Sequence, residues 1–308
     1  MMHGKTITLE GSRMLKALQS AVLGLLLFIC VGQAAEPELP PLQDTPSRKL
    51  LAGKFVWADL VTDDVASVKT FYTLLFGLAW QEVRPAPEVY GLLMLDGLPV
   101  AGVAYHEAPG VETPYGRWIH YMSVDNVARA ERVVIDRGGR TVLSRRSVDL
   151  RGEFAVVMGP DQALVGLIHS STGDPDDYRA DQGEWLWREL YTADPAASAK
   201  LYEAICQCEI FPREDRKNSF LIASQDFLRG SINSLQDTRE TSAGWLGYVQ
   251  VRDVAATIEK ATALGGKVVF APSPDVFDGR LAVIVDPVGA YLGLVSWDYA
   301  DSNGEGAE

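Results

Sequence analysis

The chain has 308 residues, of which 47% are hydrophobic and 22% are charged, a mix typical of globular proteins large enough for two ordinary domains. The formal net charge is −13 and the sequence isoelectric point is about 4.8. This acidity argues against a surface for nucleic acids or anionic membranes, because both surfaces need clustered lysine and arginine.

Residues 1–34 have the features of a signal peptide. Basic residues precede an apolar run at 21–31, and small residues follow it up to an expected cleavage site after Ala34. The run is shorter than a membrane-spanning helix needs. We therefore expect an exported protein, periplasmic or secreted, with no transmembrane segment after cleavage. The alternative is a lipid anchor through Cys30, although the residue before an acylated cysteine is normally small and here is Ile29.

A Pro-rich linker at 35–52 leads into the first domain, at 53–170. Periodicity and turn residues predict a series of elements there. The series comprises a strand at 55–61, a helix from near Asp64 to Gly77, strands near 80–84, 90–95 and 99–105, a strand at 118–124, a helix after Asn126 that ends before Gly138, and three more strands. The order βαβββ thus occurs twice in this domain.

The second half of the chain repeats the first. A linker at 171–183 leads to a second domain at 184–298, and an acidic flexible tail follows at 299–308. The offset between matched residues is 130 early in the repeat and 127 later in it. The matched pairs include Trp57 with Trp187, Tyr72 with Tyr202, Trp118 with Trp245, and Gly138-Gly139 with Gly265-Gly266. Matches at so constant an offset indicate a tandem duplication of one domain.

Two motifs shared by the copies resemble the vicinal oxygen chelate superfamily of glyoxalases, bleomycin-resistance proteins and extradiol dioxygenases. The first is Trp-x-[Asp/Glu]-Leu-x-Thr-x-Asp at 57–64 and 187–194, and the second is Trp-x-x-Tyr-x-x-Val with a later Gly-Gly. The resemblance implies an α+β fold in which two βαβββ units form a curled mixed sheet around a concave cavity. It does not imply one activity, because the superfamily hosts many chemistries.

Metal-dependent members of this superfamily place His, Gln or Glu at four inward strand positions. The resemblance assigns these positions to Trp57, Gly102, Ile119 and Gly166 in the first copy, and to Trp187, Gly230, Leu246 and Gly293 in the second. None of these side chains binds metal ions, so we expect no family-type metal site and no cofactor. A shift of one residue would bring His120 into the first cavity, but a single histidine falls short of a metal site.

The first strand of each copy is expected to have two different faces, because side chains alternate across a strand. Val56, Ala58 and Leu60 would pack against the helix, while an aromatic residue and a carboxylate would face the cavity. Gly166 and Gly293 would leave room near the cavity floors. The ligand-binding residues expected on this basis are Trp57, Asp59, Tyr121, Trp187, Glu189, Tyr248 and Tyr291.

Cys206 and Cys208 fall at the end of a predicted helix, where a free cysteine usually behaves as a small apolar residue. A redox pair is the less favoured interpretation, because C-x-C lacks the usual two-residue spacer. His106, His120 and His169 occur only in the first copy, so these histidines and the cysteines distinguish the two halves.

Three functions are compatible with these patterns. The first is a metal-free binder that holds a small organic ligand in aromatic and carboxylate-lined cavities, as a monomer or weak dimer. The alternative is an enzyme, either lactoylglutathione-lyase-like or a metal-free isomerase that uses Asp59 or Glu189 as its base. The second alternative is a structural or interaction protein whose cavities are plugged by Trp57 and Trp187.

Overall fold

The computed structural model describes residues 39–43, 45–107, 110, 114–235 and 243–299. The expected signal peptide and Cys30 lie outside these residues, as does the tail from residue 300 onward. Within the described ranges, no helix has both the length and the apolar character that crossing a membrane requires.

The first half of the chain forms one mixed sheet of eight strands in the order β2-β3-β4-β1-β5-β8-β7-β6. The strands are β1 (Phe55–Thr62), β2 (Ala79–Arg84), β3 (Tyr90–Leu95), β4 (Leu98–Tyr105), β5 (Gly116–Ser123), β6 (Arg140–Val148), β7 (Gly152–Met158) and β8 (Leu164–His169). β1 pairs antiparallel with β5 and thereby joins the two βαβββ units.

The second half forms an equivalent sheet in the order β10-β11-β12-β9-β13-β16-β15-β14. Its strands are β9 (Trp185–Thr192), β10 (Glu209–Pro212), β11 (Ser219–Ser224), β12 (Phe227–Ser234), β13 (Gly244–Gln250), β14 (Lys267–Phe270), β15 (Leu281–Val285) and β16 (Tyr291–Val295). Each sheet is built from one copy alone, so neither copy needs strands of the other to complete its sheet. The predicted fold class, two tandem domains with curled mixed sheets, is confirmed.

The helices begin where the sequence predicts them. They are α1 (Val65–Phe76), α2 (Val127–Asp136), α3 (Pro195–Cys206) and α4 (Val254–Ala263), and a short 3-10 helix spans Phe277–Gly279. Each α-helix is preceded by an Asp or Asn whose side chain accepts a hydrogen bond from a backbone N–H in the first turn. Gly77 ends α1 in the left-handed conformation that glycine adopts most readily.

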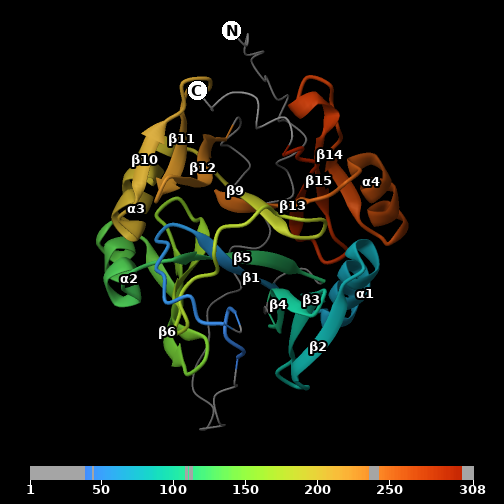
Figure 1. Ribbon diagram of the computed structural model, residues 1–308, viewed down its shortest axis with the longest axis horizontal. Helices are drawn as coiled ribbons and strands as arrows, with labels where there is room; N and C mark the ends of the chain where they lie inside the picture. The colour runs from blue at the N-terminus through green and yellow to red at the C-terminus, as the bar shows by residue number, and fades with distance from the viewer. Residues whose placement is uncertain (1–38, 44, 108–109, 111–113, 236–242, 300–308) are drawn as a thin grey trace.

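The two copies pack against each other through their helices. α1 lies beside α4 on one side of the molecule, and α2 lies beside α3 on the other (Figure 1). Two apolar cores fill these contacts, and each contains buried residues of both copies. For example, Phe71 shares a core with Ile284, and Val134 shares the other with Ile205. Because the cores cross between copies, the two domains form one packed unit.

The repeated tryptophans and tyrosines of the motifs meet in these shared cores. Trp118 Nε1 donates to the Tyr72 hydroxyl at 3.1 Å, and Trp245 Nε1 donates to the Tyr202 hydroxyl at 2.8 Å. Tyr72 in turn donates to the Asp286 carboxylate of the other copy at 3.0 Å. These buried polar groups are therefore satisfied within the shared cores.

The first strand departs from simple alternation at its start. The register of β1 against β5 shifts between Phe55 and Trp57, which is the mark of a β-bulge. As a result Val56 packs beside the cavity residues, and Phe55 instead packs against the core between the copies. The expectation for Val56 was therefore wrong, whereas Ala58 and Leu60 lie in the helix-facing core.

Cys206 and Cys208 form a disulfide at the end of α3, so the expectation of free thiols was wrong. Both residues are buried, and Gly53 passes so close that a Cβ there would lie 3.1 Å from the Cys208 sulfur. A disulfide is most often found in proteins that work in an oxidising compartment.

Candidate functional site

The cavity of the first copy is closed around the carboxylate of Asp59. Trp57 Nε1 donates to Asp59 Oδ1 at 2.8 Å, and the Tyr90 hydroxyl donates to the same oxygen at 2.9 Å. The Tyr121 ring lies against Gly166 on the neighbouring strand. Burial raises the pKa of Tyr90 and of Tyr121 well above the ordinary value, and the charge of Asp59 raises both further. Both hydroxyls therefore stay protonated and act as donors.

The cavity of the second copy is closed in a similar way around Glu189. Its carboxylate accepts hydrogen bonds from Tyr191 at 2.6 Å, Tyr248 at 2.9 Å and Ser231 at 3.1 Å. Trp187 lies next to this cluster, with Nε1 3.4 Å from the Ser231 hydroxyl. In both copies the carboxylate is thus held by its own neighbours, as a structural hydrogen-bond acceptor is.

The glycines at the last metal-ligand positions do not leave the space that we expected. A Cβ at Gly166 would collide with the Tyr121 ring, and one at Gly293 would collide with the Tyr248 ring. At Gly102 a Cβ would collide with the Asp59 carboxylate. The cavity floors are filled by tyrosine rings, so the expectation of a ligand-sized space there was wrong.

The residues at the family's metal-ligand positions do not fit a metal ion. They are tryptophan, glycine, isoleucine or leucine, and glycine, which offer no oxygen or nitrogen side-chain ligand. Elsewhere in the described ranges, no group of three or more His, Cys, Asp or Glu residues is placed to hold a metal. The metal chemistry of the superfamily therefore has no ligand set at these positions.

His120 lies outside the first cavity, on the face of β5 that meets the second copy. Ile119, its neighbour, packs among the cavity residues, so the register that placed Ile119 at the ligand position is correct. Arg188 Nε donates to His120 Nδ1 at 2.9 Å. Burial and the Arg188 charge lower the pKa of His120 well below its ordinary value. The ring is therefore neutral, and because Nδ1 accepts, its proton is on Nε2.

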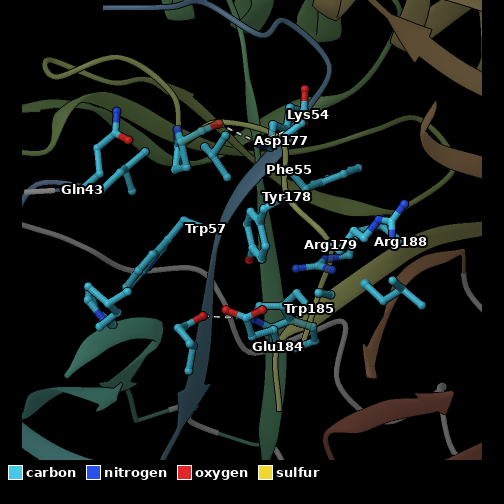
Figure 2. A pocket seen from close by; sticks show the side chains of 18 of the residues that line it. Gln43, Lys54, Phe55, Trp57, Asp177, Tyr178, Arg179, Glu184, Trp185 and Arg188 are labelled. Atoms are coloured by element: carbon cyan, nitrogen blue, oxygen red, sulfur yellow. Dashed lines mark hydrogen bonds and ion pairs between the residues drawn. The ribbon is translucent and has the colours of Figure 1, made fainter. Parts of the chain in front are cut away.

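An open cleft of about 1040 Å³ lies between the two copies (Figure 2). Of the seven predicted ligand-binding residues, only Trp57 and Trp187 line it; Asp59, Tyr121, Glu189, Tyr248 and Tyr291 do not. The other aromatic residues that line the cleft are Phe55, Tyr178, Trp185 and Phe227. Tyr291 packs inside the second cavity, where burial raises its pKa to about 12.

Positive charge exceeds negative charge in the cleft walls. The basic lining residues are Lys54, Arg179, Arg188 and Arg229, and the acidic ones are Asp177 and Glu184. Asp177 is paired with Arg229 at 2.5 Å and with Lys54 at 3.0 Å. Arg188 instead contacts the neutral His120, the Trp187 carbonyl and the face of the Trp185 ring. Burial lowers the pKa of Arg188 to about 9, so it keeps its charge at pH 7.

Arg151 is a residue that the sequence interpretation overlooked. Its guanidinium carbon lies 4.1 Å from the centre of the Trp57 ring, and the residue is only 2% exposed. The signal was present in the repeat, because Arg151 is matched by the oppositely charged Asp278 in the second copy. This change of charge at a matched position distinguishes the two halves.

Comparisons with known proteins give relatives over most of the chain, although no protein family model matches it. The chain is 28% identical over 249 residues to "Putative glyoxylase CFP32" of Mycobacterium tuberculosis, which covers 78% of this chain and 93% of that protein. It is 27% identical over 261 residues to "Anthracycline biosynthesis protein DnrV" of Streptomyces peucetius, with 79% and 93% covered.

Solved structures share the fold at lower identity. The Mn(II)-bound glyoxalase from Novosphingobium aromaticivorans aligns with a TM-score of 0.52 and 12% identity, over 80% of this chain and 83% of that one. The 2,3-dioxygenase LapB from Pseudomonas sp. KL28 aligns with a TM-score of 0.53 and 12% identity, over 81% and 94%. Likeness at this level concerns architecture, and activity has to be argued from the residues.

Proposed function

From the tandem vicinal oxygen chelate fold of this chain, we propose that it is an exported, metal-independent protein that binds a small aromatic molecule between its two copies. The observation that carries the proposal is the cleft of about 1040 Å³, which is at the upper end of the size of ligand pockets. Its walls combine aromatic rings with a few charged groups, as small-molecule sites usually do.

The aromatic lining supports a flat ligand. Trp57 and Trp187 come from the first strands of the two copies, and Trp185 begins the strand that carries Trp187. Phe227 is 52% exposed and so offers its ring to a ligand without supporting the core. Stacked or edge-on ring contacts of this kind contribute about 0.5–1.5 kcal/mol each beyond the area that they bury.

The filled cavities argue against the carboxylate chemistry that we considered. Asp59 and Glu189 each accept two or three hydrogen bonds from their own cavities, and neither lines the cleft. A general base has to reach a proton of the substrate within hydrogen-bond distance. An enzyme that uses Asp59 or Glu189 as base is therefore less well supported than a binder.

A lyase remains the second candidate, because one relative carries the name of a glyoxylase. A lyase would turn over a hemithioacetal of methylglyoxal and a thiol, whereas a binder would not. Steady-state assays with and without added divalent metal ions separate the two candidates. Metal-dependent turnover at enzymatic rates would contradict the metal-independent proposal.

Two exposed phenylalanines of the second sheet provide a matched test of the cleft. Phe227 lines the cleft, whereas Phe211, which is 40% exposed, does not. We expect Phe227→Ala to weaken the binding of an aromatic probe such as indole by about 2- to 10-fold, the worth of one ring contact. Phe211→Ala should leave the affinity for indole unchanged. Isothermal titration calorimetry measures both, and equal affinity in the two variants would refute a site in the cleft.

A further inference from the structure

The guanidinium of Arg151 is buried and has no hydrogen-bond partner among the residues that the structure describes. The residue lies in the turn between β6 and β7 and is 2% exposed. None of its three nitrogens, Nε, Nη1 and Nη2, has a hydrogen-bond partner within the described ranges, and the guanidinium stacks on the Trp57 ring. Burying a charge without paired hydrogen bonds is among the most costly arrangements in a protein. Arginine offers five N–H donors in a planar fork, so this group is suited to an acceptor from outside the chain.

The surroundings of Arg151 place this charge in the cavity of the first copy. Trp57 occupies the first metal-ligand position of the superfamily, and the Tyr121 ring covers Gly166, the last one. The positive charge of Arg151 also lowers the pKa of Tyr90 and Tyr121, against the effect of burial, so the guanidinium lies close to both hydroxyls. The guanidinium thus lies among the residues at positions that the resemblance assigns to a metal site.

The described part of the second copy has no counterpart of this arrangement. Asp278 stands at the position matched to Arg151, and it is exposed. The hydroxyls of Tyr191, Tyr248 and Ser231 already satisfy the Glu189 carboxylate. Among the described residues, the first cavity but not the second therefore has a buried cation without an acceptor, which predicts one ligand for each chain.

We propose that the first copy is an anion site in which Arg151 binds the carboxylate group of a small organic acid against Trp57. The planar fork of a guanidinium matches the two oxygens of a carboxylate in a bidentate pair. The tyrosine hydroxyls of the cavity lie beside this pair. Trp57 both lines the cleft and stacks on Arg151, so the cleft is the side from which an aromatic acid would approach. The site goes beyond the proposed binding in the cleft, since it assigns a charge to the ligand and a residue that selects it.

Benzoate and benzamide test the proposal, because they share a ring and differ in the anion. Calorimetry on the purified protein should give one benzoate per chain, bound at least about tenfold more tightly than benzamide, the factor expected of a charge-assisted hydrogen bond. Acetate should bind weakly and compete with benzoate. Tighter binding of phosphate than of benzoate would overturn the assignment to a carboxylate.

Substitutions test whether Arg151 is the residue that binds the carboxylate. Arg151→Met should abolish the preference for benzoate, and Arg151→Lys should keep part of it, because lysine retains the charge without the fork. Arg132 is exposed on α2, so Arg132→Met is the matched control and should bind benzoate as the wild type does. A buried charge without hydrogen bonds is costly, and methionine keeps much of the arginine side-chain length, so Arg151→Met should fold, and circular dichroism checks this. Unchanged benzoate affinity in Arg151→Met would overturn the proposal.

The outcomes separate this site from the proposed function. Binding of indole that depends on Phe227, together with benzoate binding no tighter than benzamide, would overturn the anion site and leave the binding cleft standing. Benzoate binding that depends on Arg151 but is unaffected by Phe227→Ala would support the anion site and count against the cleft.

Discussion

The carboxyl group of Asp286 is expected to make the stability of the protein depend on pH. It is 3% exposed and accepts hydrogen bonds from the Tyr72 hydroxyl at 3.0 Å and from the backbone of Val288 and Ala290. Burial raises its pKa from 3.8 to about 7, although these hydrogen bonds oppose the rise. Because Tyr72 belongs to the other copy, this carboxyl group reports on the packing of the two domains.

The sign of the effect follows from the two pKa values. Between about pH 4 and pH 7 the folded protein holds a proton on Asp286 that the unfolded chain has released, so stability falls as the pH rises through this window. The stabilisation of the folded state by protonated Asp286 is fully present below about pH 4 and is lost above about pH 7. The difference between a pKa of about 7 and one of 3.8 corresponds to at most about 4 kcal/mol.

Asp286→Asn removes the titrating group and keeps an oxygen for the backbone hydrogen bonds. Urea unfolding at several pH values should show the stability of the wild type, relative to this variant, falling by up to about 4 kcal/mol between pH 4 and pH 7. His120 has the opposite effect on stability, because its lowered pKa costs stability as the pH falls below 6.5. Both proteins contain His120, so its effect cancels in the difference between wild type and Asp286→Asn. The exposed Asp226→Asn is the control. A pH-independent difference for Asp286→Asn would refute the buried contact between the copies.

Two further predictions concern the same packing. Tyr202→Phe should cost about 1–3 kcal/mol in urea unfolding, because Trp245 Nε1 would lose its acceptor; a loss near zero would mean that this hydrogen bond contributes nothing. Because Cys206 and Cys208 form a disulfide, thiol titration of the denatured, unreduced protein should detect no reactive thiol from this pair. Reduction should release two thiols. Two reactive thiols from the pair before reduction would contradict the disulfide.

Much of the fold could be predicted from periodicity and capping. The strand and helix order, the N-caps at Asp64 and Asp194 and the inward direction of Trp57 and Trp187 all follow from local patterns that the duplication repeats. The direction of Val56 could not be predicted from local patterns, because the bulge depends on how β1 pairs with β5, a strand far along the chain.

The candidate site was harder to predict because it depends on contacts between the copies. The cleft is formed where the two domains meet, so alternation within one strand indicated Trp57 and Trp187 but not Arg188 or Phe227. Tyrosine rings fill the space above the cavity glycines, and a glycine in a sequence does not reveal what covers it. Arg151 could have been found by comparing charges at matched positions of the repeat.

The metal content of the purified protein tests the central claim most directly. The claim is that tryptophan, tyrosine and glycine close the cavities of this fold at the positions that the resemblance assigns to metal ligands, and that the protein binds its ligand through side chains without a metal ion. Elemental analysis of protein produced with added manganese, nickel, zinc and iron should find none of them in stoichiometric amount. One tightly held metal ion per chain or per domain would contradict the account.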